Sequence, residues 1–277
     1  MDKSKVKNFI LILLALVNIF LLIIVIKNAT EEKKAESSRM QALGKILEED
    51  GIALSPDTKL PETVPPTLSL KRDMNAELHR VSSLIGKCSV EEQAGNIFIY
   101  KGNDGEARFR GTGEFEIILY SGIIKMGKDS VGAAKTALRK LGIKSGDTEP
   151  VVTVDSSNTI VELCCTRDGM SIYNAIVSVK FMGDNIYSIS GTLPFDTKNA
   201  VKSSENYPDS ITILMGFLES RNQKGYNEIT DIKIGYNIYP TVSGSCTLIP
   251  IWYITTNSGS YQLDAETGES ENIDNLS

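Results

Sequence analysis

The sequence predicts an α+β protein, in which an N-terminal transmembrane helix precedes an ectodomain of two related units, each with a helix packed on an antiparallel sheet. Three observations predict this fold: a long apolar run near the N terminus, later stretches in which one helix-like segment precedes several strand-like segments, and turn residues between the strands. The expected division is a cytoplasmic tail at 1–8, a transmembrane helix at 9–26, a membrane-proximal helix and linker at 27–60, a first unit at 61–145 and a second unit at 146–277.

The apolar run covers residues 9–26 and contains one polar residue, Asn18. At about 1.5 Å per helical residue, this run nearly spans a hydrocarbon core of ~30 Å. The residues that follow lack the small-residue cleavage site of a signal peptide. Because Lys3, Lys5 and Lys7 precede the run, the positive-inside rule predicts a cytoplasmic N terminus. We therefore expect a single-pass protein of the cell membrane with its C-terminal ectodomain outside.

Helical spacing resumes in residues 31–49, where Leu43, Ile46 and Leu47 recur at three- and four-residue steps. Gly51 is placed to cap the C terminus of this helix. Four prolines then indicate a loop or an extended segment at 55–66. We expect the helix to lead from the membrane into the first unit.

The rest of the ectodomain alternates helices with strands, and turns such as Asn103-Asp104-Gly105 separate the strands. Helices are expected at 75–84, 129–141 (capped at Gly142) and 210–220. Strands are expected at 97–100, 107–110, 115–120, 151–154, 160–165, 175–181, 186–190 and 231–239.

The closing stretch, residues 248–269, predicts a β-hairpin. Trp252 and Ile254 alternate with Tyr253, which is the two-residue period of a strand. Asn257-Ser258-Gly259 supplies the turn. Trp252 is expected to fill a core against the helix at 210–220, since buried aromatic side chains usually serve packing.

The charge of the ectodomain argues against nucleic acid as a partner. The chain holds 29 Lys and Arg against 35 Asp and Glu, and after residue 27 the balance is 25 against 34, a net charge of −9. The sequence shows no basic cluster to offset this charge, so an anionic polymer should be repelled.

Cys88, Cys164, Cys165 and Cys246 have no CxxC spacing, which removes the usual zinc and thioredoxin-like interpretations. Cys164 and Cys165 are adjacent in a predicted strand and should point to opposite faces. Buried free thiols are favoured, and a structural disulfide remains open because an outside compartment permits it.

No catalytic or metal-binding motif is present in the sequence. His79 is the only histidine, and neither a GxSxG elbow nor an HExxH pair occurs. Gly111-Thr112-Gly113 joins two predicted strands and opens no helix, so it fails as a dinucleotide fingerprint. Glu114 and Glu116 lie on one face of one strand, unlike the carboxylate pair of a glycosidase. We expect no enzymatic activity, no cofactor and no metal site.

The two ends of the chain together resemble a known family. Residues 1–7 run directly into an apolar helix that carries Asn18-Ile19-Phe20-Leu21, and LEEDGI at 47–52 ends the next helix. The ending, LIPIWYIT at 248–255 with Tyr261 and AETG at 265–268, looks like the terminal hairpin of the YycH/YycI group and of PepSY-type domains. The chain therefore resembles YycI-type regulatory proteins. This resemblance implies an accessory protein of an essential sensor histidine kinase, in a two-component system that governs cell-wall metabolism in low-GC Gram-positive bacteria, with a YycH-like partner.

Asn18 is the polar residue that a partner helix would satisfy within the bilayer, where an unpaired amide is costly. The amide could equally bond its own helix backbone. Leu14, Asn18 and Phe20 are the candidate partner-binding residues. The sequence thus favours a membrane-anchored regulator of a kinase, and the alternative is a PepSY-like inhibitor or binder of an extracytoplasmic peptidase or wall ligand.

Overall fold

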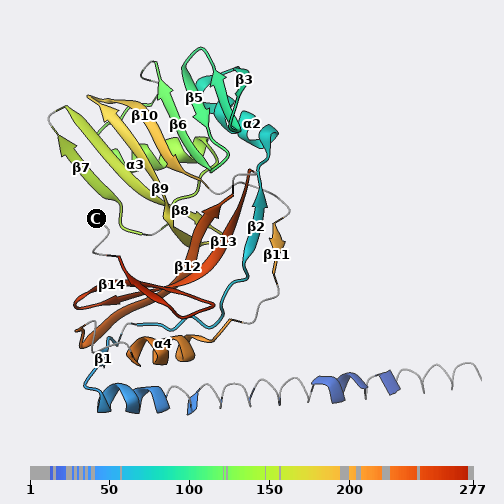
Figure 1. Cartoon of the computed structure of the whole chain (residues 1–277), viewed down its shortest axis with the longest axis vertical. Helices are drawn as coiled ribbons and strands as arrows, with labels where there is room; N and C mark the ends of the chain where they lie inside the picture. Colours follow the sequence, from blue (N-terminus) through green and yellow to red (C-terminus); the bar gives the residue numbers. More distant parts are fainter. Residues whose placement is uncertain are drawn as a thin grey trace, which may run out of the picture.

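One mixed and mostly antiparallel sheet connects two hydrophobic cores along the length of the protein (Figure 1). The fold is α+β, as expected. The computed structural model describes residues 13–14, 17–22, 27, 30, 34, 37–38 and 41–273, except 57, 121, 123, 147, 156, 194–199, 204–206, 220–224 and 242–243.

The larger core lies between two helices and an eight-stranded antiparallel part of the sheet. Helix α2 (Met74–Ile85) buries Val81, Leu84 and Ile85, and α3 (Ser130–Lys140) buries Ala134, Ala137 and Leu138 in the same cluster. The strands, in spatial order, are β7 (Val151–Asp155), β8 (Asn158–Arg167), β9 (Met170–Met182), β10 (Asn185–Thr192), β6 (Glu114–Leu119), β5 (Gly105–Phe109), β4 (Ile97–Lys101) and β3 (Ser89–Gln93).

The ends of α2 and α3 follow from their capping residues. Asp73 accepts hydrogen bonds from the backbone N–H groups of Asn75 and Ala76 at the start of α2, and Asp129 does the same for Gly132 in α3. Helix α3 ends at Lys140 with Leu141 as its C-cap, and Gly142 follows with a φ of +69° that favours glycine. Ile143 N then donates to Leu138 O at 2.9 Å, which closes the end of the helix. The cap predicted at Gly142 is confirmed.

The smaller core is built from both ends of the chain. It unites Leu43 and Leu47 of the helix at 41–49 with residues of α4 (Ser210–Glu219) and with the closing hairpin. Strands β1 (Ala53–Leu54), β12 (Glu228–Pro240), β13 (Ser245–Thr256) and β14 (Gly259–Asp264) contribute to it, and β15 (Ser270–Asn272) pairs with β14. Strand β2 (Leu68–Lys71) pairs with β13 and with β11 (Val201–Lys202), but its Leu68 and Leu70 lie in the larger core. The buried leucines of the helix at 41–49 therefore pack in the same core as α4.

The two longest C-terminal strands belong to both cores. Ile232 of β12 and Trp252 of β13 lie in the smaller core, whereas Ile238 of β12 and Leu248 of β13 lie in the larger one. The division expected at residue 145 falls between α3 and β8, which contribute to the same core. Strand pairs such as β6 with β10 join segments from the two sides of residue 145.

The predicted hairpin is confirmed as β13 and β14, which pair antiparallel from Ile251↔Asp264 to Thr256↔Gly259. Trp252 is 1% exposed and lies in the cluster that contains α4. Tyr253 points to the other face, where it stacks on Tyr173 with ring centroids 4.6 Å apart. The strands β1, β2, β3, β11 and β15 were not expected from the sequence.

All four cysteines are free, and Cys164, Cys165 and Cys246 are buried while Cys88 is half-buried. Cys165 belongs to the larger core, whereas Cys164 Sγ lies 3.2 Å from Ile172 O, its hydrogen-bond acceptor. Burial raises the pKa of Cys165 to about 12 and also raises the pKa of Cys164. These two thiols are therefore protonated and unreactive at neutral pH.

Most of the predicted transmembrane segment at 9–26 lies outside the described residues. Within the part of the chain that the structure describes, no helix is both long enough and apolar enough to cross a membrane.

Trp252→Ala should lower the free energy of unfolding by roughly 3–5 kcal/mol, because it removes a large side chain from a closed core. Tyr253→Ala should cost less, since Tyr253 is half-buried. Urea unfolding followed by far-UV circular dichroism measures both; fluorescence is unsuitable because Trp252 is the only Trp. Equal midpoints for Trp252→Ala and the wild type would contradict the packing role.

Candidate functional site

The three candidate partner-binding residues lie in helical, exposed positions. Leu14 is 59% exposed, Phe20 is 64% exposed and Asn18 is also exposed. Leu14 and Asn18 are four residues apart and share one helix face, whereas Phe20 lies about 200° around the helix from Asn18. The helix therefore places two of the three residues together, and their contact with a partner stays a prediction.

The helix at 41–49 is joined tightly to the ectodomain. Leu43 is 1% exposed and Leu47 is 4% exposed, and both pack in the smaller core. The helix ends where Ile52 N donates to Leu47 O at 2.8 Å, and Ile52 is itself buried. Strand β1 follows at once and pairs in parallel with β12. The chain thus passes from helix to sheet without an unpacked segment.

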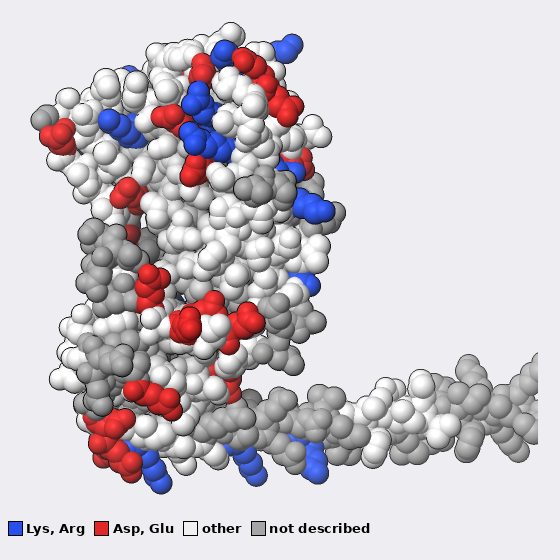
Figure 2. Space-filling view, viewed as in Figure 1, with Lys and Arg blue, Asp and Glu red and all other residues white. Residues whose placement is uncertain are grey.

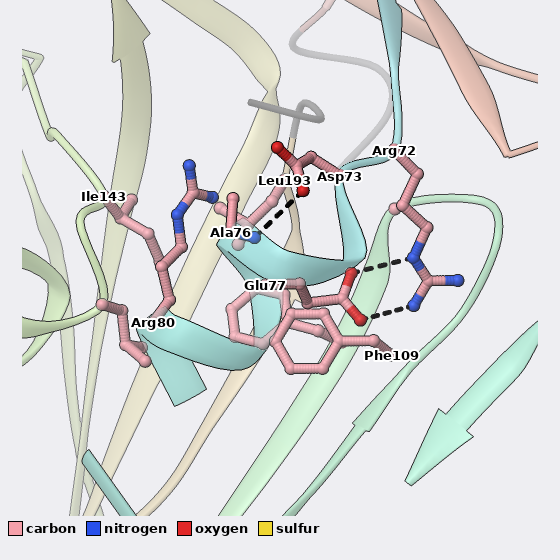
Figure 3. Close-up of a pocket in the computed structure, with 11 residues that line it drawn as sticks. Arg72, Asp73, Ala76, Glu77, Arg80, Phe109, Ile143 and Leu193 are labelled. Carbon is pink, nitrogen blue, oxygen red and sulfur yellow. Dashed lines mark hydrogen bonds and ion pairs between the residues drawn. The ribbon is translucent and has the colours of Figure 1, made fainter. Parts of the chain in front are cut away.

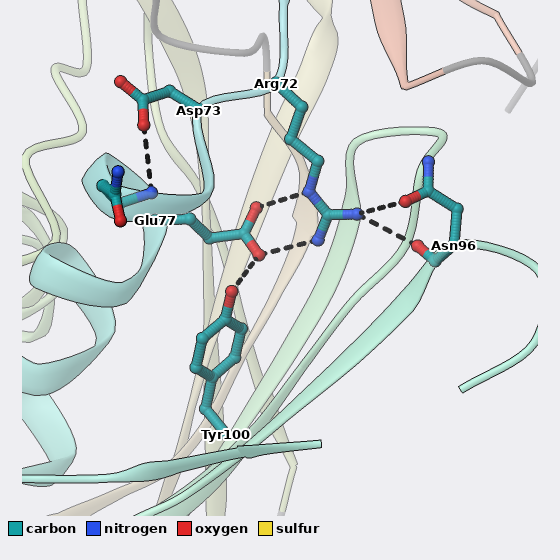
Figure 4. Close-up of polar contacts among 6 residues, drawn as sticks. Arg72, Asp73, Glu77, Asn96 and Tyr100 are labelled. Carbon is teal, nitrogen blue, oxygen red and sulfur yellow. Dashed lines mark hydrogen bonds and ion pairs between the residues drawn. The ribbon is translucent and has the colours of Figure 1, made fainter. Parts of the chain in front are cut away.

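A buried ion pair lies where β2 ends and α2 begins. Arg72 Nη2 is 2.6 Å from Glu77 Oε1, and Arg72 Nε donates to Glu77 Oε2 at 2.8 Å, a bidentate arrangement (Figure 4). Their side chains are only 5% and 10% exposed. Tyr100 O–H donates to Glu77 Oε1 at 2.6 Å. Burial first, and then this hydrogen bond, raise the pKa of Tyr100, so its hydroxyl remains a donor.

Asn96 completes the coordination of Arg72. Arg72 Nη1 donates to Asn96 O at 3.0 Å and to Asn96 Oδ1 at 3.4 Å (Figure 4). The Arg72 guanidinium also lies 4.6 Å from the centre of the Phe98 ring. A Cβ on Gly111 would lie 2.5 Å from Asn96 Nδ2, so only glycine leaves room for this amide. The charged groups are satisfied by protein partners, which is the arrangement a buried ion pair needs.

A small cavity of about 30 Å³ adjoins this ion pair (Figure 3). Arg72, Asp73 and Glu77 line one side, and Arg80 extends along another. The remaining lining is mostly apolar and comes from Ala76, Phe109, Gly113, Phe115, Leu141, Ile143 and Leu193. The cavity is large enough for one methyl group or one water molecule.

The other sequence candidates for chemistry do not converge. His79 is exposed on α2, and Glu114 and Glu116 are exposed on β6. Gly111-Thr112-Gly113 forms the turn between β5 and β6, as predicted. Over the described ranges, no three His, Cys, Asp or Glu side chains are grouped to hold a metal ion.

The sequence contained part of the signal for the ion pair. Asp73 is a typical N-cap, and Glu77 follows in the first helical turn. The bond from Tyr100 and the contacts with Asn96 depend on the pairing of β3 with β4 and on the turn between them, which no local pattern specifies.

No protein-family model matches the chain, and no curated protein matches its sequence. A crystal structure of an uncharacterized protein from Eubacterium rectale ATCC 33656 is similar at 11% identity and a TM-score of 0.49, over 80% of this chain and 90% of that one. The Bacillus megaterium YpeB C-terminal domain is similar at 9% identity and a TM-score of 0.37, over 73% and 98%. Neither likeness is close enough to support an argument about family or function.

Removing either partner of the ion pair should be costly. Arg72→Met or Glu77→Gln alone should lower the free energy of unfolding by about 3–5 kcal/mol, because a buried charge is left uncompensated. The double variant should lose much less than the sum of the two single variants. Urea unfolding of all four proteins measures this coupling.

Glu114→Gln is the matched control for that series, since the Arg110–Glu114 pair is 52% and 56% exposed at 3.6 Å. It should leave the free energy of unfolding nearly unchanged, because solvent screens exposed pairs. Additive losses from the two Arg72 and Glu77 single variants would mean that the pair has no special energetic role.

Proposed function

We propose that the protein is a membrane-anchored extracytoplasmic accessory protein that regulates a sensor histidine kinase of a two-component system governing the cell wall. The N terminus is cytoplasmic, the C-terminal ectodomain lies outside, and contacts of both the transmembrane helix and the ectodomain carry the regulation. The ectodomain acts as two related units with a PepSY-like closing hairpin, and a YycH-like protein is the second partner. The protein binds no nucleic acid and carries out no catalysis.

The burial of Leu43 and Leu47 supports this proposal most directly. Each fully buried leucine contributes roughly 1.5–3 kcal/mol, so detaching the helix from the core would cost about 3–6 kcal/mol. A helix held this firmly moves together with the ectodomain. Such a connection suits a protein that passes a change in its ectodomain to a neighbouring transmembrane helix.

A simple tether would not require this connection. An ectodomain that only inhibits a peptidase or binds a wall ligand needs an anchor, and a flexible linker serves that purpose equally well. A requirement for a stiff connection therefore distinguishes the proposed regulator from the PepSY-like inhibitor or binder.

The test is a seven-residue insertion placed directly before Gln41. A Gly/Ser insertion leaves Leu43 and Leu47 in the core but makes the connection flexible, and it should abolish regulation of the kinase. A seven-alanine insertion is the matched control, because two helical turns keep both stiffness and phase within about 20°. Kinase-dependent reporter expression in cells is the readout. Full regulation by the Gly/Ser variant would contradict the proposal and favour the tethered inhibitor or binder.

Asn18→Leu should weaken association with the kinase by ~0.6–2 kcal/mol, about threefold to thirtyfold, because an interhelical amide hydrogen bond is lost. Membrane insertion should be unaffected, since the helix becomes more apolar. Val17→Leu, a neighbouring apolar exchange, is the control. Co-purification of the kinase from detergent-solubilised membranes measures the association. Equal amounts of kinase recovered with Asn18→Leu and with Val17→Leu would show that the Asn18 amide has no role in the interface.

A further inference from the structure

The edge strand β7 leaves three valines open to solvent. Val151 is 57% exposed, Val152 is 43% exposed and Val154 is 71% exposed. Among the described strands, β7 pairs with β8 alone, and Figure 1 shows it at the outer edge of the sheet. Residues 151–154 make no backbone hydrogen bond to any described residue outside β8. The edge therefore presents backbone donors and acceptors together with apolar side chains.

A row of apolar side chains crosses the sheet on its buried face and ends at Val152. Ile189 of β10, Val179 of β9 and Val161 of β8 are neighbours in register, and all three are fully buried in the larger core. Val152 lies opposite Val161 and is the last member of the row. Because directly opposite residues of an antiparallel pair share one face, Val152 carries the apolar face past the last buried strand.

A second row ends at Val154 in the same way. Ile186 of β10, Phe181 of β9 and Thr159 of β8 precede it in register, and the first two are buried. Val152 and Val154 are two residues apart, so both rows end on the same face of β7. One further strand beside β7 would cover both valines.

The strand β7 is complementary to itself. When Thr153 lies opposite Thr153 of a second copy in an antiparallel pair, Val152 lies opposite Val154 of that copy. A twofold axis perpendicular to the sheet relates the two strands, and it keeps the buried faces of both copies on one side. The row that ends at Val152 then continues into the row that ends at Val154 of the second copy. Because alternate residues direct their backbone groups to the outer edge, this pairing adds about four to six hydrogen bonds.

The other described edge strands are not suited to such self-pairing. If β3 paired with itself about its central residue, Glu91 would lie opposite Glu91, and like charges directly opposite destabilise a strand pair. Strands β1 and β11 have two residues each, and β15 has three. Charges and short length are common protections of an edge against association. In β7 the register about Thr153 sets Asp155 opposite Val151, so no two charges face each other.

The distribution of charge along the chain is compatible with contact at this edge. Residues 68–192, which include β7, hold 15 Lys and Arg and 15 Asp and Glu, whereas the net charge of −9 beyond residue 27 comes from the other segments. Acidic side chains gather over the smaller core on the face seen in Figure 2, while Lys and Arg lie among acidic residues over the larger core. Two copies that meet through β7 therefore bring together parts of the chain that carry no net charge.

We propose that a second copy of the chain binds at β7, and that the two β7 strands pair antiparallel about Thr153 to form one sheet through both ectodomains. The valines of both strands then cover the open ends of the two larger cores. Two five-residue strands form a smaller contact than the ~1,200–2,000 Å² of a stable interface, so association is reversible and weak. The membrane anchor proposed above would raise the effective concentration of the copies, whereas the pairing itself depends only on β7.

Oxidative crosslinking of the full chain in cells that express it tests this register. Thr153→Cys places two thiols at the twofold axis, where opposite Cα atoms are about 4.5–5.5 Å apart, within the range of a disulfide. Oxidation should therefore give a crosslinked dimer on non-reducing electrophoresis. The wild type, with its four native cysteines, measures the background.

Val151→Cys is the matched control, because Val151 is exposed on the same face of the same strand. In the proposed register the two copies of this position are about 14 Å apart, so a disulfide is excluded. Val151→Cys should give no more dimer than the wild type.

Two further variants in the Thr153→Cys chain test the valines. Val154→Lys places a charge in the apolar row and should abolish the crosslinked dimer. Val154 is largely exposed, so this replacement should not disturb folding, and far-UV circular dichroism verifies this. Val90→Lys, at an exposed valine of the edge strand β3, is the matched control and should leave the amount of dimer unchanged.

Three results would overturn the proposal: no dimer from Thr153→Cys, equal amounts of dimer from Thr153→Cys and Val151→Cys, or an undiminished dimer when Val154→Lys is present. A crosslink of Thr153→Cys to a different protein in place of the dimer would also reject the second copy and assign the edge to a foreign strand.

Discussion

The buried ion pair between Arg72 and Glu77 is the interaction on which the joint between β2, α2 and the β3–β4 turn depends. Arg72 follows β2, which pairs with β13, and its backbone N–H donates to Gly244 O at 3.0 Å, directly before β13. Its guanidinium reaches Glu77 on α2 and Asn96 in the turn between β3 and β4. One side chain therefore connects the β2–β13 strand pair, whose Leu70 and Leu248 lie in the larger core, with a helix and a turn of the same core. Because every charged group has a partner, the desolvation of both ions is compensated.

The same junction places the features with functional potential. Helix α2 starts at Asp73, so the position of the ion pair fixes where Arg80 emerges two turns later. Arg80 lines the small cavity beside the ion pair. At the opposite end of the protein, Leu43 and Leu47 fix the incoming helix to the smaller core (Figure 1). The ion pair with its cavity and the attachment of the N-terminal helix thus lie at different cores, which share β12 and β13.

Local patterns predicted the elements better than their arrangement. The cap at Gly142 located the end of α3, and two-residue alternation located the hairpin of Trp252. The partners of β1 and β2 could not be read from the sequence, because each pairs with a strand more than 170 residues away. The contacts of Arg72 with Asn96 were missed for a similar reason, because only the pairing of β3 with β4 and the turn between them bring Asn96 to the guanidinium. Leu14, Asn18 and Phe20 remain candidates from the sequence alone.

The pairing of the first strands with the last has a consequence for how the chain acquires its structure. Ala53 and Leu54 lie beside Glu228 and Ile229, and Leu68 to Lys71 lie beside Ser245 to Leu248. During synthesis, β1 therefore remains without β12, and β2 without β13, until more than three quarters of the chain has been made. Such distant pairings slow folding, because the entropy of closing a large loop is lost before any stabilising contact forms. The larger core contains hairpins of adjacent strands from β3 to β6 and can assemble early, so the smaller core, with the helix attached to it, is expected to form last.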